Sequence, residues 1–115
     1  MTDCLFCKIV KKGIASDVVS ENELVLAIKD ISPQAPVHLL LIPKRHYATL
    51  NDIPELELSV VTEVFRMARR LARSMGIAQT GFRTVVNTNR QGGQSVFHVH
   101  FHLLGGRQLG GSMVG

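Results

Sequence analysis

The chain has 115 residues, of which 45% are hydrophobic and 19% are charged, so we expect one folded domain and exclude a disordered chain or a fibrous repeat. Thirteen lysines and arginines against nine acidic residues give a net charge of +4. This balance suits a phosphate-bearing ligand and does not by itself predict a nucleic-acid partner. The first residues form no long apolar segment, and the densest apolar stretch, Val37 to Pro43, is too short to span a bilayer. We therefore expect a cytoplasmic protein with no membrane partner.

Hydrophobic periodicity and turn residues predict two helices and four strands. In chain order they are a helix over 4–12, strands over 24–29 and 37–42, a long helix from Asn51 or Asp52 to Ser74 or Met75, and strands over 82–88 and 96–104. The strand 37–42 is almost continuously apolar, which predicts a central position with both faces buried. Strands in adjacent groups around one main helix predict an α+β fold with a mostly antiparallel sheet.

The predicted long helix carries a wider apolar face than one sheet requires. At about 100° per residue its apolar side chains fill an arc of roughly 200°. They are Leu56, Leu58, Val60, Val61, Val64, Phe65, Met67, Ala68, Leu71 and Ala72. We expect a second copy of the chain to cover the surplus, although a loop or a terminus could also do so. The remaining positions are crowded by arginines, which we interpret as a solvated helix face: Arg66, Arg69, Arg70 and Arg73.

The most informative segment alternates three histidines with apolar residues. Strand alternation predicts His98, His100 and His102 on one face, about 7 Å apart from one to the next. The opposite face would enter the core through Phe97, Val99, Phe101 and Leu103. Such a row of rings is hard to explain by packing, because each buried imidazole needs a partner. Its residue types fit either metal ligation or nucleophilic and acid–base catalysis, and this strand lacks the carboxylates usual in a hydrolytic metal site.

A glycine-containing loop precedes this strand. Its sequence is Gly92-Gly93-Gln94-Ser95. Two glycines often mark only a turn, but they also allow close approach of the backbone to a ligand. Backbone N–H groups, the Gln94 amide and the Ser95 hydroxyl are suited to a phosphate oxyanion.

Three segments resemble the histidine triad (HIT) family, and in particular its Hint branch of nucleotide-binding phosphoramidases. They are DISPQAPVHLLLIPKRH over 30–46, VVN over 85–87 and GGQSVFHVHFHLLGGRQ over 92–108. The resemblance runs from Cys4 to about Gln108 and implies one HIT domain over 1–115. It also implies a five-stranded antiparallel sheet with one main helix and a short N-terminal helix. Two such chains would pair into a homodimer with a continuous sheet.

The resemblance implies a hydrolase that cleaves the P–N bond of purine nucleoside 5′-phosphoramidates, such as AMP joined to an amine. His100 would attack the α-phosphorus and form a covalent nucleotidyl-histidine, which water then converts to AMP. The other members of the implied catalytic group are His102, His98, Ser95 and His38. Asp30 would bind the ribose and Ile31 the purine. The phosphate would be surrounded by Asn87, Gly93, Gln94, Ser95, Val96 and His102, with no cofactor required for the reaction.

The two cysteines, Cys4 and Cys7, form a C-x-x-C pair. In a reducing compartment this spacing favours a metal or redox pair over a structural disulfide. Some family members with this pair bind zinc together with two histidines, which correspond here to His46 and His98. The resemblance thus implies a Cys₂His₂ zinc site in which His98 is a ligand with an orienting role. The alternative is a pair of reduced thiols beside a surface His46.

The last seven residues, 109–115, depart from the Trp-Pro-Pro-Gly-like ending of Hint proteins, and we expect them to form a flexible tail. Without the aromatic residue of that ending, the amine preference is not implied. Two other functions compete with the hydrolase. One is a nucleotide- or partner-binding dimer with little catalytic activity, and the other is a metallohydrolase that uses the three histidines as ligands.

Overall fold

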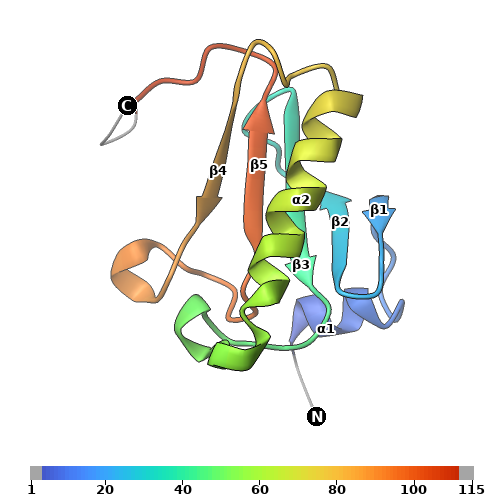
Figure 1. Ribbon diagram of the computed structural model, residues 1–115, viewed down its shortest axis with the longest axis vertical. Helices are drawn as coiled ribbons and strands as arrows, with labels where there is room; N and C mark the ends of the chain where they lie inside the picture. Colours follow the sequence, from blue (N-terminus) through green and yellow to red (C-terminus); the bar gives the residue numbers. More distant parts are fainter. Residues whose placement is uncertain (1–3, 112–115) are drawn as a thin grey trace.

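The computed structural model describes residues 4–111, which form a five-stranded antiparallel sheet with one long and one short helix. The helices are α1 (Leu5–Val10) and α2 (Ser59–Ser74). The strands are β1 (Val18–Glu21), β2 (Val25–Lys29), β3 (Val37–Pro43), β4 (Phe82–Val86) and β5 (Phe101–Gly105). Their order in the sheet is β1-β2-β3-β5-β4 (Figure 1). The expected α+β fold is confirmed, and within 4–111 no helix is long and apolar enough to cross a membrane.

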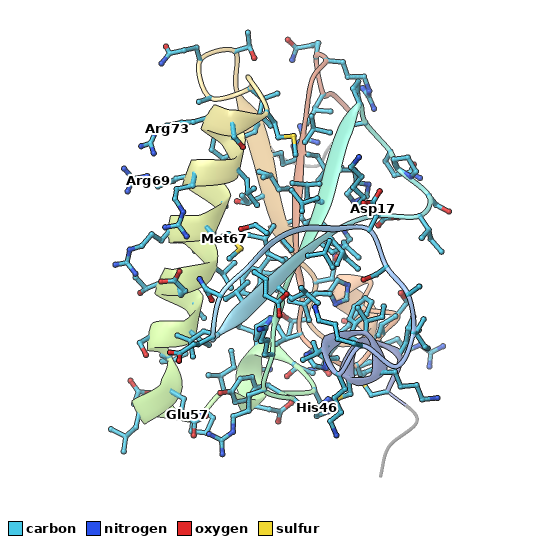
Figure 2. All side chains as sticks on the ribbon, turned by 90° about the vertical axis from the view of Figure 1, so that its right-hand side faces the viewer. Asp17, His46, Glu57, Met67, Arg69 and Arg73 are labelled. Carbon is cyan, nitrogen blue, oxygen red and sulfur yellow. The ribbon has the colours of Figure 1, made fainter. Side chains whose placement is uncertain are left out.

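The central strand β3 separates two hydrophobic clusters. Leu39 and Leu41 face α2, whereas Leu40 and Ile42 face α1, because successive strand residues point to opposite faces. Figure 1 shows α2 lying diagonally across the sheet, and Figure 2 shows the two helices on opposite sides of it. We call these two sides the α2 face and the α1 face. The predicted central, doubly buried position of 37–42 is confirmed.

The long helix begins later than the sequence indicated. Thr49 and Asp52 form a capping box at a single 3-10 turn over Leu50–Asp52, and a second such turn spans Glu55–Glu57. Ile53 lies between the two turns and directly before Pro54. Its backbone is extended, because a proline disfavours the helical conformation in the residue before it. The start predicted at Asn51 or Asp52 is therefore wrong, and the α-helix proper begins at Ser59.

The end of α2 is the expected one. Gly76 adopts a positive φ of 76°, and its N–H donates to the Arg73 carbonyl at 3.1 Å. The next N–H, that of Ile77, donates to the Ala72 carbonyl at 2.9 Å. These two bonds form a Schellman motif, in which glycine accepts the left-handed conformation without a steric penalty.

The apolar arc of α2 is buried only in part. Six of its residues lie in the core: Val60, Val64, Met67, Ala68, Leu71 and Ala72. Phe65 is 41% exposed, although its ring meets Phe101 edge-on at a centroid distance of 5.8 Å. Leu56 is 96% exposed and lies before the helix, in the second 3-10 turn. The surplus apolar surface is thus real, and its cover by a second chain stays a prediction.

The last strand is shorter than predicted. It begins at Phe101 rather than Val96, because the pairing with β3 and β4 reaches only as far as Leu41 and Val86. The residues before it are held differently, since the Val99 N–H donates to the Tyr47 carbonyl in a neighbouring loop at 2.7 Å. The strand predicted over 82–88 likewise ends at Val86.

Candidate active site and metal cluster

His38 and His102 project from adjacent strands onto the α1 face. In the register of β3 and β5, His102 lies opposite Leu40, and His38 lies two residues away on the same face. The His38 Nε2 atom is 2.9 Å from His102 Nδ1 and 3.4 Å from a carboxylate oxygen of Asp30. A predicted nucleotide-binding carboxylate and two predicted catalytic rings therefore meet at one place.

Hydrogen bonds to the backbone define the proton positions in this group. The Gln34 N–H donates to His38 Nδ1 at 3.0 Å, so a neutral His38 carries its proton on Nε2. That Nε2–H can donate to His102 Nδ1, which leaves the His102 proton on its other nitrogen. Burial, followed by the nearby His100 and His38 rings, lowers the pKa of His102 to about 4. His102 is thus a neutral N–H donor at neutral pH.

His100 is oriented by the backbone two residues before it. Its Nδ1 atom lies 2.8 Å from the His98 carbonyl oxygen, which can only accept, so Nδ1 carries the proton. The lone pair is then on Nε2. Burial lowers the pKa of His100 as well, which favours the neutral ring. The His100 and His102 rings are neighbours, with centroids 5.2 Å apart.

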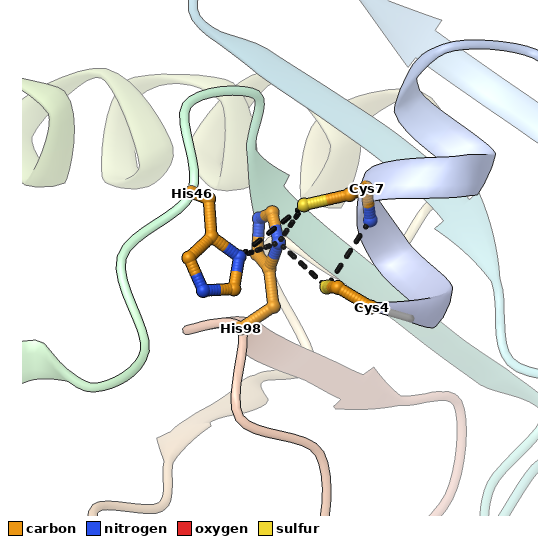
Figure 3. A group of neighbouring side chains, drawn as sticks. All are labelled: Cys4, Cys7, His46 and His98. Atoms are coloured by element: carbon orange, nitrogen blue, oxygen red, sulfur yellow. Dashed lines mark hydrogen bonds between the residues drawn. The ribbon is translucent and has the colours of Figure 1, made fainter. Parts of the chain in front are cut away.

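His98 belongs to a different group from the other two triad histidines. Its side chain is fully buried, and its Nε2–H donates to the Pro43 carbonyl at 2.8 Å. Its Nδ1 atom faces Cys4 Sγ at 3.3 Å, Cys7 Sγ at 3.5 Å and His46 Nδ1 at 3.1 Å. Figure 3 shows these four side chains converging from α1, from the loop after β3 and from the segment before β5. Residues 94 positions apart in the sequence thus form one cluster.

The donor set of this cluster fits a zinc ion. The single Nδ1 lone pair of His98 faces three polar atoms at once, which is more than one hydrogen bond can satisfy. Cys7 Sγ is also 3.2 Å from His46 Nδ1, and all four ligand atoms lie within 4.8 Å of one another. Tetrahedral zinc with two thiolates and two imidazoles requires ligand atoms about 3.3–3.8 Å apart. The four side chains therefore need little movement to hold the metal.

The loop before the triad uses most of its own hydrogen-bonding groups internally. The N–H groups of Gly92, Gly93 and Gln94 donate to the carbonyls of Asn89 and Arg90. The buried Gln94 amide accepts from the Asn89 N–H and donates to the carbonyls of Ala48 and Val96. Gln94 therefore braces the loop.

The other predicted ligand-binding residues lie at or near the surface. Ser95 is exposed, Val96 is half-buried, and the Asn87 amide donates to the Gly92 carbonyl at 2.7 Å. Gly93 has a φ of 85°, the left-handed conformation that glycine favours. Ile31 is 99% exposed beside Asp30, whose second oxygen accepts the Ser32 N–H at 2.7 Å.

The alternation of the triad holds in part. Phe101 and Leu103 are buried on the α2 face, and Val99 joins the same cluster, as predicted. Phe97 is 47% exposed, so its predicted place in the core is wrong, because residues 96–100 are not in the regular strand. Phe6 and Gln34 contribute to the site although the sequence analysis did not single them out. The only available signal for Gln34 was its place in the DISPQAP segment.

Comparison with known proteins identifies the family. The HIT domain family model matches residues 11–109, and the chain belongs to this family. It is 45% identical over 108 residues to the purine nucleoside phosphoramidase of Escherichia coli (strain K12), covering 94% of this chain and 91% of the relative.

Solved structures agree with this assignment. A HIT family hydrolase from Legionella pneumophila Philadelphia 1 superposes with a TM-score of 0.90 at 48% identity, covering 92% of this chain and 95% of the other. A histidine triad protein from Clostridium difficile gives a TM-score of 0.94 at 42% identity, covering 97% of each chain. The predicted family and its five-stranded antiparallel fold are thereby confirmed.

Proposed function

We propose that the chain is a hydrolase that cleaves the P–N bond of purine nucleoside 5′-phosphoramidates. The observation that carries this proposal is the hydrogen bond from His100 Nδ1 to the His98 carbonyl, which leaves a lone pair on Nε2 of a ring that neighbours His102, with centroids 5.2 Å apart. The 45% identity to a phosphoramidase supports the same reaction.

The reaction follows from these proton positions. His100 Nε2 attacks the α-phosphorus, the P–N bond breaks, and the amine departs with a proton that the Ser95 hydroxyl relays from solvent water. The His102 N–H donates to a phosphoryl oxygen, where negative charge increases in the transition state. Water then attacks phosphorus and releases one proton to solvent, the N–P bond to His100 breaks with its electron pair returning to Nε2, and AMP leaves. The His98 carbonyl keeps the other ring nitrogen of His100 protonated throughout both steps.

The nucleotide-binding residues keep their proposed roles, with one refinement. Asp30 binds the ribose hydroxyls, and the exposed Ile31 contacts the purine. The phosphate is held by Ser95, Val96 and Asn87 together with His102, while Gly93, whose N–H donates to the Arg90 carbonyl, allows close approach of the loop backbone. Because the polar groups of Gln94 are used within the loop, we assign it the task of keeping that loop in shape.

We also propose that zinc occupies the Cys4, Cys7, His46 and His98 cluster and anchors the N-terminal segment to the triad. The chemistry at phosphorus does not involve this ion, so the metallohydrolase alternative gives the opposite result on chelation. Turnover per folded molecule should persist at a reduced rate after removal of the metal under this proposal and vanish under the alternative. Circular dichroism recorded in parallel separates loss of chemistry from loss of fold.

The remaining features are proposed from the family and the surface. We propose a single HIT domain that pairs as a homodimer in the cytoplasm, with the exposed Phe65 of α2 at the contact. The predicted tail, 109–115, is described only as far as Gly111, and residues 112–115 lie outside the described part of the chain.

Replacing the proposed nucleophile tests the function directly. His100→Ala should lower kcat for an AMP–amine substrate by at least about a thousandfold, because no other ring has its lone pair in the same position. AMP should still bind, as isothermal calorimetry can measure. Mass spectrometry of quenched wild-type protein should detect the nucleotidyl adduct on His100. Turnover near the wild-type rate in His100→Ala would contradict the proposal, and tight AMP binding without turnover in the wild type would favour the binding dimer.

A further inference from the structure

The helix α1 connects the metal cluster to the proposed nucleophile. Cys4 is the N-cap of this helix and Cys7 lies within it, while Phe6 between them points to the sheet and is only 5% exposed. The helix has six residues, which is too short to be stable without tertiary contacts. Its position on the α1 face therefore depends on the contacts that its side chains make with the rest of the chain.

Phe6 lies against the rings of both His98 and His100. Its ring meets His100 edge-on, with centroids 4.9 Å apart and an interplanar angle of 81°. It meets His98 in a similar arrangement at 6.0 Å and 76°. Edge-to-face contacts of this kind restrict how each ring can tilt. One side of the His100 imidazole is thus bounded by a side chain from α1.

His98 provides a second connection. Its ring nitrogens are directed at the cluster and at the Pro43 carbonyl, and its own carbonyl accepts from His100 Nδ1. A change in the cluster that moves His98 must therefore also move the acceptor that orients His100.

We propose that Phe6 is a positioning residue for His100 and that the Cys4, Cys7, His46 and His98 cluster holds Phe6 in place, so that a bound metal orders the nucleophile. The importance of this order for turnover rests on the proposed function, whereas the contacts themselves do not. The competing explanation is that Phe6 only fills the small apolar cluster beneath α1, as its neighbour Ile9 does.

Nuclear magnetic resonance of histidine side chains tests this proposal at one fixed pH. The full chain is labelled with ¹³C at histidine Cε1, and the His100 signal is assigned with His100→Gln. The samples are zinc-loaded wild type, zinc-depleted wild type, zinc-loaded Phe6→Leu and zinc-loaded Ile9→Val. Ile9→Val is the matched control, because Ile9 is buried on the same helix and in the same apolar cluster as Phe6 but carries no aromatic ring.

We expect zinc depletion and Phe6→Leu each to shift and broaden the His100 signal, while Ile9→Val leaves it in place. An unchanged signal in Phe6→Leu, or loss of its fold with zinc bound, would overturn the positioning role. An unchanged signal after zinc depletion would overturn the anchoring role. Unfolding of the whole chain after depletion, seen in the amide spectrum, would also overturn it, because the cluster would then support the entire fold rather than α1.

A kinetic measurement links the proposal to turnover. In single turnover, Phe6→Leu should slow formation of the nucleotidyl adduct about tenfold at unchanged zinc content, because a misoriented ring reaches the attack geometry less often. Ile9→Val should react at the wild-type rate. If wild type forms no adduct the proposed function fails, yet the spectra, recorded without nucleotide, still decide whether Phe6 and the cluster order His100.

Discussion

The two faces of the sheet bury different kinds of side chain. Among the described residues the α2 face packs fourteen buried hydrophobic residues into one cluster, whereas the cluster on the α1 face has six. The α1 face instead holds the interacting rings of His38, His98, His100 and His102. The larger apolar core and the histidine group are thus separated by the thickness of one sheet, and alternate residues of a single strand contribute to each.

Neighbouring leucines of β3 test this separation with the largest expected effect. Leu41→Ala, on the α2 face, should lower the free energy of unfolding by about 3 kcal/mol, because it leaves a cavity in the larger cluster. Leu40→Ala, on the α1 face, should cost about 2 kcal/mol and also reduce turnover, since Leu40 lies opposite His102. Urea denaturation and kinetic assays of the folded proteins measure both. Equal losses of turnover in the two variants would refute the separation.

Replacing His38 should leave the fold intact and strongly reduce turnover. His38→Ala takes away the partner of His102 Nδ1, so the His102 proton is no longer directed to Nε2, the nitrogen that we propose donates to the phosphate. We expect kcat to fall about a hundredfold. The control is Thr84→Ala on the exposed side of β4, which should retain wild-type turnover. A His38→Ala enzyme as fast as this control would show that the tautomer of His102 is set in another way.

Lowering the pH should reduce the free energy of unfolding through His102 on the α1 face. The pKa of His102 is lowered from 6.5 to about 4 in the folded protein, mainly by burial. Between these values the unfolded state binds more protons, so protonation favours unfolding. The contribution of His102 is fully present above about pH 6.5 and is lost as the pH falls toward 4. Denaturation curves from pH 7.5 downward should show this decline, and His102→Gln should make it shallower. A slope unaffected by the substitution would contradict this assignment.

The smallest effect is expected on the outer side of α2. Figure 2 shows Arg69 and Arg73 directed away from the sheet, and Arg66 pairs with Glu63 at 2.8 Å. Arg69→Ala should change the free energy of unfolding by less than about 0.5 kcal/mol. Arg66→Ala should lose slightly more, because it gives up the exposed ion pair. A loss above about 1 kcal/mol for Arg69→Ala would mean that this arginine face is not simply solvated.

The sequence predicted features that depend on local pattern. Hydrophobic periodicity accounts for the doubly buried β3 and for the inward side chains of Phe101 and Leu103. The conformational freedom of Gly76 accounts for the end of α2. The predicted start of α2 is wrong because a proline such as Pro54 is compatible with a first helical turn but also forces the residue before it, Ile53, to be extended. The first half of the last predicted strand is wrong, because alternation in one segment does not reveal where its partner strands end.

The site was predictable to a smaller extent. The convergence of Cys4 with His98 spans 94 residues, and only the family resemblance indicated it. The expectation that Gln94 presents its amide to phosphate could not be judged from sequence, because the carbonyl of Ala48 that it holds lies in a distant loop. Hydrogen-bond satisfaction of a buried amide is a property of the assembled fold.

The junction at Phe101, where regular strand pairing begins, has a consequence for motion. His102 is held inside the ladder between β3 and β4, whereas Val99 is tied by its N–H to a single loop carbonyl. The segment with His98 and His100 is therefore held by the buried side chains of His98 and Val99 rather than by strand pairing, and we expect it to open locally before the sheet does. The amide of Val99 should then exchange with deuterium faster than that of Leu103, and His100, the proposed nucleophile, would be displaced transiently while the sheet stays folded.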